Sequence, residues 1–183
     1  DINKKDAKEL RDLRFGAVLT FMPDGIARGT SALVGLNDTN VNHVIINDKS
    51  AAHYSFKKGS SSQSYPISIM GCNALLRQTH YDALWYQHQQ SEQFHDESLE
   101  AYLNTQSLPQ LFSTDNLLNL LGAGKVGQEI GKNYIIKGSG DEYQRIEEVK
   151  SLNSPLIIPL NFPSPPDVSN PYESLDVSLR EMK

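Results

Sequence analysis

Three glycines, Gly122, Gly124 and Gly127, have the G-x-G-x-x-G spacing of a dinucleotide-binding turn. That chemistry needs a strand that ends at the first glycine, so that backbone N–H groups at a helix N-terminus face a pyrophosphate. The preceding residues 116–121 (NLLNLL) fit a helix at least as well, and the next predicted strand ends in Lys137 instead of an acidic residue. A nucleotide-binding Rossmann-like module that uses Gly122–Gly127 therefore remains the alternative function.

The histidines offer a second kind of chemistry. His88, Glu92 and His95 are spaced i, i+4 and i+7, which would place three zinc ligands on one face of a continuous helix. Their neighbours are all polar, which is typical of a solvent-facing helix end. The other histidines form no H-x-H or H-E-x-x-H pair, and the single Cys72 excludes an internal disulfide and a cysteine zinc cluster. We therefore expect no catalytic residue, bound metal or other cofactor in this segment.

A third set of residues follows predicted strands: Asp24, Arg28, Asp115, Lys137 and Asn161. In a parallel α/β sheet the carboxyl ends of the strands share one edge, where ligands bind. We expect these residues to line any ligand site of the segment, with Arg28 and Lys137 engaging a carboxylate or phosphate. For Asp24 and Arg28 the alternative is that they only hold their own loop in place.

The elements that would position these residues follow from the apolar pattern. Helices are predicted at 3–14, 66–90, 96–105, 116–132 and 140–151, and strands at 15–21, 32–36, 43–47, 111–112, 134–137 and 155–160. From residue 111 onward, strands and helices alternate with short connections, which is typical of a parallel sheet. The unbroken apolar run 15–21 predicts a strand covered on both faces. The expected fold class is α/β, with a mainly parallel sheet and flanking helices.

Composition narrows the class of partner. The chain has 183 residues and a formal net charge of -5, with 17 Lys+Arg against 22 Asp+Glu. This balance argues against nucleic acid or an anionic membrane as the partner. No apolar run reaches the ~18 residues that a membrane span needs, so we expect a soluble protein. Its compartment stays open, and a periplasmic or extracellular location would follow if a longer parent protein carried a signal peptide.

Several longer stretches resemble a known superfamily. Residues 24–36 (DGIARGTSALVGL), 43–56 (HVIINDKSAAHYSF) and 65–86 (YPISIMGCNALLRQTHYDALWY) are similar to the amidohydrolase superfamily, above all to its imidazolonepropionase-like branch. Residues 138–159 (GSGDEYQRIEEVKSLNSPLIIP) resemble a later strand–helix segment of the same proteins. The likeness covers most of residues 10–162.

The resemblance implies a (β/α)₈ barrel in which a metal-activated water hydrolyses a non-peptide C–N bond. Such a barrel needs about 250 residues, so the chain is expected to be a single incomplete amidohydrolase-like domain and a partial TIM-barrel-like segment. Within it, 1–110 would hold the first strands and the long helix, 111–162 the repeating strand–helix part, and 163–183 a proline-rich loop and the start of a C-terminal helix. We expect zinc or another divalent metal only in a complete, active family member.

The departures from the family bear on activity. The family's internal H-x-H aligns with residues 111–116 (LFSTDN), and its His-Gly aligns with Lys137-Gly138. Both metal-binding histidines are therefore replaced, which predicts a degenerate metal site and an inactive or structural segment. The expected partners are the remaining parts of a parent chain, or other copies of the segment that associate through an open sheet edge into an oligomer.

Overall fold

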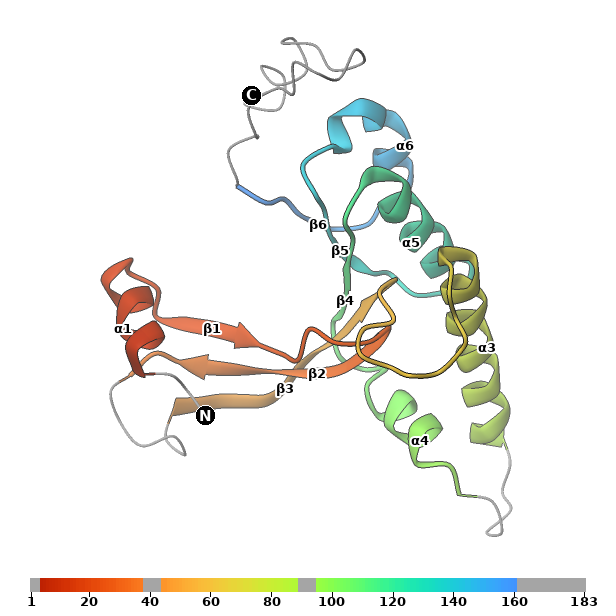
Figure 1. Ribbon diagram of the computed structural model, residues 1–183, viewed down its shortest axis with the longest axis horizontal. Helices are drawn as coiled ribbons and strands as arrows, with labels where there is room; N and C mark the ends of the chain where they lie inside the picture. Colours follow the sequence, from red (N-terminus) through yellow and green to blue (C-terminus); the bar gives the residue numbers. More distant parts are fainter. Residues whose placement is uncertain (1–3, 38–43, 89–94, 161–183) are drawn as a thin grey trace. The chain divides into compact units, whose positions relative to one another are not determined.

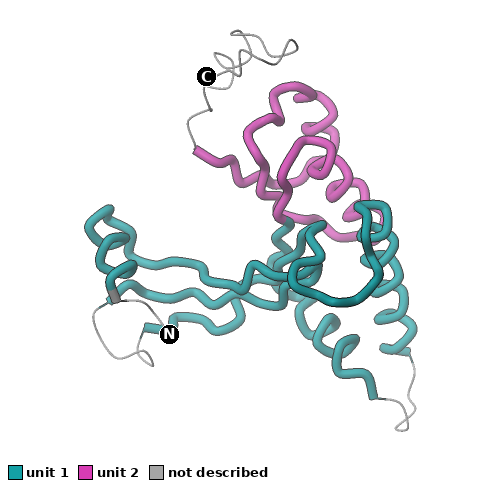
Figure 2. The backbone as a smooth tube through the Cα atoms, in the orientation of Figure 1, with its two compact units in different colours: residues 1–112 teal, residues 113–183 magenta. Residues whose placement is uncertain are grey.

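The computed structural model describes residues 4–37, 44–88 and 95–160 (Figure 1). The chain divides into two compact units, Asp1–Phe112 and Ser113–Lys183 (Figure 2). Both contain helices and strands, so the mixed α/β class is confirmed. In the described ranges, no helix is long and apolar enough to cross a membrane.

An antiparallel meander follows the first helix of the first unit. The helix is α1 (Lys4–Asp12), and the strands of the meander are β1 (Ala17–Thr20), β2 (Ala27–Gly35) and β3 (Ile45–Ser55). β1 pairs with β2 and β2 pairs with β3, both antiparallel. The prediction of a mainly parallel sheet is wrong here, because residues 21–26 and 36–44 are too short for the crossover of about a dozen residues that parallel neighbours need.

The solvent exposure of the meander also differs from the prediction. β1 was expected to be covered on both faces, yet Ala17, Leu19 and Thr20 are exposed. The first half of β3 is exposed as well, whereas its second half, from Ala51 to Ser55, is buried. Polar residues 47–49 lie inside this strand and not after it, so the predicted strand 43–47 covers only its beginning.

Aromatic rings pack together at the end of β3. Phe112 of β4 (Gln110–Ser113) is fully buried and its ring lies 4.7 Å from that of Phe56. The long helix α3 (Ile69–His88) buries Cys72, Leu76, His80 and Ala83. It packs against α4 (Glu97–Asn104), whose N-terminus is capped by the Asp96 side chain. Both helices lie within the ranges predicted for them.

The second unit has the predicted strand–helix alternation. It consists of α5 (Leu117–Glu129), β5 (Ile135–Lys137), the 3₁₀ turn η1 (Glu142–Arg145), α6 (Ile146–Ser151) and β6 (Leu156–Ile157). β5 and β6 pair in parallel, with Ile136 opposite Leu156. Its core contains Leu120, Val126, Tyr134, Ile136, Val149 and Leu152. The parallel part of the fold prediction therefore holds for this pair of strands.

The glycines of the apparent dinucleotide fingerprint lie inside α5, whose N-cap is Asn116. A β-carbon on Gly124 would lie 2.5 Å from the Leu152 side chain, and one on Gly127 would lie 2.7 Å from the Lys132 carbonyl oxygen and 2.8 Å from the Tyr134 ring. These glycines let other parts of the unit approach the helix closely. The Rossmann interpretation of Gly122–Gly127 is wrong, because no strand-to-helix turn carries these residues.

We predict that Gly127→Ala lowers the free energy of unfolding by roughly 1–3 kcal/mol, because the new methyl group meets a backbone oxygen and a buried ring. Gly124→Ala is the matched control in the same helix. It gains the same helix propensity, about 1 kcal/mol, and its methyl group would meet the Leu152 side chain, which can shift more easily than a backbone oxygen. Urea unfolding followed by circular dichroism measures both. Equal effects of the two variants would contradict the packing role given to Gly127.

Candidate functional site

The residues predicted to bind a ligand fall in both units. Asp24 lies in the connection from β1 to β2, whereas Arg28 lies within β2 and not after a strand. Asp115 follows β4 and Lys137 is the last residue of β5. Asn161 is outside the described residues. Whether all five line one site stays a prediction, and the two units are considered separately below.

In the first unit, Asp24 and Arg28 make contacts that hold their own loop. The Asp24 carboxylate accepts hydrogen bonds from the Ser60 backbone N–H, at 2.8 Å, and from the Ser60 hydroxyl. These bonds to the charged form lower the pKa of Asp24. Arg28 Nε donates to the Gly25 carbonyl oxygen at 3.2 Å. The contacts are those of the loop-holding alternative, so ligand binding by this pair remains only a prediction.

Gly59 has the backbone conformation that lets this connection close. Its φ is +70°, and a β-carbon would lie 1.9 Å from the Asp24 carboxylate. A side chain at residue 59 would therefore be strained and would also displace the carboxylate from Ser60. The small residues of the loop 58–64 are thus explained by its contact with Asp24.

His53 is a buried titratable group in the same unit. Only 2% of its surface is exposed, and its ring stacks on Phe21 with 3.9 Å between centroids. Its Nε2 atom has no hydrogen-bond partner among the described residues. Burial, with a smaller contribution from the charge of Arg28, lowers the pKa of His53. The imidazole is therefore held in its neutral form.

A buried polar network joins β3, α4 and β4. The Tyr54 hydroxyl donates to Gln110 Oε1 at 2.9 Å. Gln110 Nε2 in turn donates to the carbonyl oxygens of Thr105 and Leu108, both at 2.7 Å. Burial raises the pKa of Tyr54, so its hydroxyl stays a neutral donor. The network fixes the entry into β4, and the sequence pattern gave no signal for it because its partners are backbone carbonyls.

A second buried contact links α3 to α4. His80 Nδ1 lies 3.2 Å from the Tyr102 hydroxyl oxygen. The pKa of Tyr102 is raised by burial and, to a smaller extent, by Tyr54. His53 and His80 thus both make packing contacts in this unit.

In the second unit, the ends of β4 and β5 are tied together. Thr114 donates twice to the Lys137 carbonyl oxygen, from its backbone N–H at 3.0 Å and from its hydroxyl at 2.9 Å. Asp115 follows Thr114 directly, so Asp115 lies close to the strand end that carries Lys137. Both residues are exposed. This strand-end edge is the part of the predicted site that the structure brings together.

The loop after Lys137 completes that edge. Glu142 accepts hydrogen bonds from the backbone N–H groups of Ser139, at 2.7 Å, and Gly140, at 3.0 Å. Asp141 accepts one from the N–H of Leu117, at the first turn of α5, at 2.9 Å. A β-carbon on Gly138 would overlap the Glu142 carboxylate. Sequence analysis missed both acids, although the glycines at 138 and 140 beside two carboxylates indicate such a backbone-binding loop.

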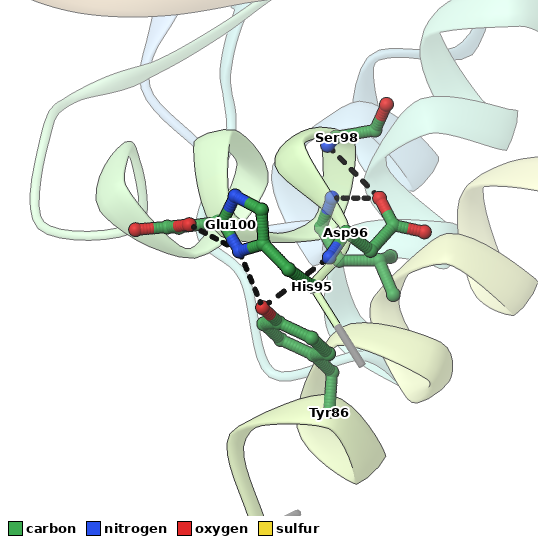
Figure 3. Close-up of polar contacts among 6 residues, drawn as sticks. Tyr86, His95, Asp96, Ser98 and Glu100 are labelled. Carbon is green, nitrogen blue, oxygen red and sulfur yellow. Dashed lines mark hydrogen bonds and ion pairs between the residues drawn. The ribbon is translucent and has the colours of Figure 1, made fainter. Parts of the chain in front are cut away.

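The zinc candidates of α3 do not form a helical face. α3 ends at His88 and α4 begins at Glu97, so His88 and His95 are not on one helix, and Glu92 lies outside the described residues. Figure 3 shows His95 near Tyr86 and Glu100, with its Nδ1 atom 3.5 Å from the Tyr86 hydroxyl and 3.4 Å from a Glu100 oxygen. The residues that the structure describes contain no group of three or more His, Cys, Asp or Glu that could hold a metal ion.

With this geometry established, we compared the chain with known proteins. No protein-family model and no curated protein matches it. A solved structure, an amidohydrolase from Thermotoga maritima, is similar with a TM-score of 0.71 and 13% sequence identity, over 99% of this chain and 52% of that protein. The fold is amidohydrolase-like. The chain spans about half the length of that amidohydrolase, and the imidazolonepropionase-like branch stays a prediction.

We predict that stability falls as the pH drops below about 6.5, the ordinary pKa of histidine. The folded-state pKa of His53 is lowered, so between that value and 6.5 the unfolded chain binds more protons and acid favours unfolding. Chemical unfolding of the wild type and of His53→Gln between pH 5 and 8 measures this. The variant should lose part of the pH dependence, and an unchanged slope would contradict the assignment to His53.

Proposed function

We propose that the chain is a structural, catalytically inactive part of an amidohydrolase-like protein. In its complete form, that protein is a metal-dependent hydrolase of non-peptide C–N bonds. The fold likeness to an amidohydrolase carries this proposal. A second argument comes from the residues at the ends of β4 and β5. There the family resemblance implies histidines, whereas this chain has Thr114, Asp115 and Lys137-Gly138.

The donor set at this edge does not suit a catalytic divalent metal. The Asp115 carboxylate is the single good oxygen ligand at this edge, because the Thr114 hydroxyl is already bonded to a carbonyl oxygen. The Lys137 ammonium group adds a positive charge that repels a metal cation. Asp141 and Glu142 are turned to backbone N–H groups of their own loop and of α5. We therefore derive no metal-dependent step for this segment and assign any catalytic metal of the complete protein to residues outside it.

What the edge does offer is a site for a polar or anionic group. Lys137 is an exposed point charge at the end of a buried strand, and Asp115 beside it supplies an acceptor. The two serve as a positioning pair for a substrate carboxylate or amide in the complete protein, whereas the chemistry of bond cleavage lies elsewhere.

The inactivity is tested by metal binding and turnover. The full 183-residue chain, freed of metal with a chelator and then dialysed against Zn²⁺, should retain well under one zinc per chain by elemental analysis. It should hydrolyse cyclic amides and imidazolones no faster than buffer. One zinc per chain that is lost in His53→Ala or His80→Ala, together with measurable turnover, would overturn the proposal, and circular dichroism shows whether each variant is folded.

The ligand edge is tested with inorganic phosphate and succinate as probes, titrated by NMR or calorimetry. Lys137→Met should weaken anion binding at least tenfold, whereas Lys137→Arg should keep part of it. Thermal stability should change little, because the fold uses the Lys137 carbonyl oxygen and not its side chain.

The matched control for this edge is Lys150→Met, which removes an exposed lysine from α6 of the same unit. It should leave anion binding unchanged. Equal losses in the two variants would indicate a general charge effect and contradict a site at Lys137, and so would a wild type that binds neither probe.

A further inference from the structure

The connection 21–26, between β1 and β2, is held against the end of β3 by a few hydrogen bonds. The Ser55 backbone N–H donates to the Ile26 carbonyl oxygen at 2.9 Å, and the Ser55 hydroxyl donates to the Gly25 carbonyl oxygen at 3.0 Å. The Ser60 N–H donates to a carboxylate of the same connection at 2.8 Å. Because these bonds lie at the end of the strand ladder or beyond it, they can open while the rest of the ladder stays paired.

The His53 imidazole is packed beneath this connection. Its ring is nearly parallel to that of Phe21, with an angle of 12° between the ring planes and 3.9 Å between the centroids. The Nε2 atom is buried and has no hydrogen-bond partner among the described residues. An apolar ring would fill the same place without a buried polar atom that lacks a partner, which is unfavourable. The chain therefore carries a titratable group at a position where packing alone favours an apolar side chain.

The surroundings of His53 disfavour a positive charge. Strand register places Arg28 of β2 close to His53, and burial, followed by the charge of Arg28, lowers the pKa of the imidazole. The other charged residues of the segments around it are Asp24, whose carboxylate is hydrogen-bonded to the loop 58–64, and Lys57, which follows β3. Among these residues, a protonated imidazole is a buried charge without a counter-ion. The attraction of such a charge to an aromatic ring is smaller than the penalty of its desolvation.

We propose that His53 is a pH-sensitive latch: when its imidazole becomes positively charged, Phe21 and the connection 21–26 are released from the end of β3, while the rest of the chain stays folded. Displacement of Phe21 is the smallest movement that brings water to the imidazole, because this ring covers it directly. The hydrogen bonds of Ser55 and Ser60 to the connection are lost in the same step. This latch goes beyond the proposed function and does not depend on it.

The backbone amides of Ser55 and Ser60 report on the closed latch, because both donate to the connection. Hydrogen exchange of the full chain, followed by NMR between pH 5 and 8 and corrected for the intrinsic exchange rates, measures their protection. In the wild type, protection of both amides should fall at least tenfold from pH 8 to pH 5, with the fall starting near the ordinary histidine pKa of about 6.5.

Two other amides serve as internal controls in the same experiment. The Leu36 N–H donates to the Gly16 carbonyl oxygen at the opposite end of β1 and β2, and the Ile136 N–H donates to the Pro155 carbonyl oxygen in the second unit. Neither bond involves the connection. Both amides should keep their protection throughout the pH range.

Two variants test the role of the imidazole and of the charge beside it. His53→Phe keeps a ring for the stack but binds no proton, so it should abolish the pH-dependent fall at Ser55 and Ser60. His53→Gln, which is smaller, should do the same, and circular dichroism at pH 7.5 shows that each variant is folded. Arg28→Gln removes the neighbouring positive charge and keeps a side-chain donor, so it should make the fall smaller.

Asp24→Asn is the matched control, since it removes the other titratable group of the connection. The pKa of Asp24 is lowered below 3.8 by its bonds to Ser60, so this carboxylate stays charged between pH 5 and 8. The variant should weaken protection of the Ser60 amide at every pH, and the pH-dependent fall at Ser55 should remain. Loss of that fall would assign the pH dependence to Asp24 and contradict the latch.

Three further results would overturn the proposal. One is constant protection of Ser55 and Ser60 from pH 8 to pH 5 in the wild type. Another is an undiminished fall in both His53 variants. The third is an equal loss of protection at Leu36 and Ile136, which would show that acid unfolds the whole chain and does not release the connection alone.

Discussion

The Lys137 carbonyl oxygen is the contact on which the second unit depends. It accepts both hydrogen bonds of Thr114, and this fixes the start of the second unit against the end of β5. Asn116 then caps α5 two residues later, so the helix can begin only where that contact has placed the chain. A carbonyl oxygen that accepts two hydrogen bonds has both lone pairs satisfied, so opening the junction breaks both bonds. The exposed Asp115 and Lys137 side chains are therefore held at neighbouring positions by backbone chemistry that does not involve them.

Carboxylates elsewhere in the two units also hold backbone segments in place by accepting hydrogen bonds. Asp24 binds the backbone and hydroxyl of Ser60, Glu142 binds two N–H groups of its own loop, and Asp141 binds the first turn of α5. Each satisfies donors that would otherwise be unpaired in a tight connection. These acids shape loops, which is why their presence at strand ends is weak evidence for catalysis.

Sequence reasoning succeeded where local signals and tertiary packing agree. The apolar spacing of residues 66–90 predicted the long helix, which the structure places at Ile69–His88. The alternation of strands and helices after residue 111 predicted β5, α6 and β6, because each short connection leaves only a parallel arrangement. For the predicted ligand site, strand-end position singled out Asp115 and Lys137, and the structure places both at strand ends, whereas their ligand role stays a prediction. It could not find Asp141 and Glu142, since their partners are backbone groups whose placement follows from the folded loop.

The failures have physical causes of their own. The apolar run 15–21 predicts a buried strand, but it forms one side of an exposed hairpin. Whether a strand is buried depends on the elements that pack against it, and the residue pattern of the strand does not specify those elements. The glycines at 122, 124 and 127 match a nucleotide fingerprint because both a phosphate turn and a tightly packed helix require the absence of a β-carbon.

The likeness to an amidohydrolase and the unlike strand ends are compatible, because different forces maintain them. Packing of Leu120, Val126, Tyr134 and Ile136 fixes how strands and helices stack, and many apolar sequences satisfy that requirement, so a fold can persist at 13% identity. Metal binding tolerates no such freedom, since it needs particular donor atoms at particular strand ends. Lys137, the last residue of β5, is exposed and lies outside that packing. The fold of this chain is therefore weak evidence of its chemistry, which depends on the residues at the strand ends.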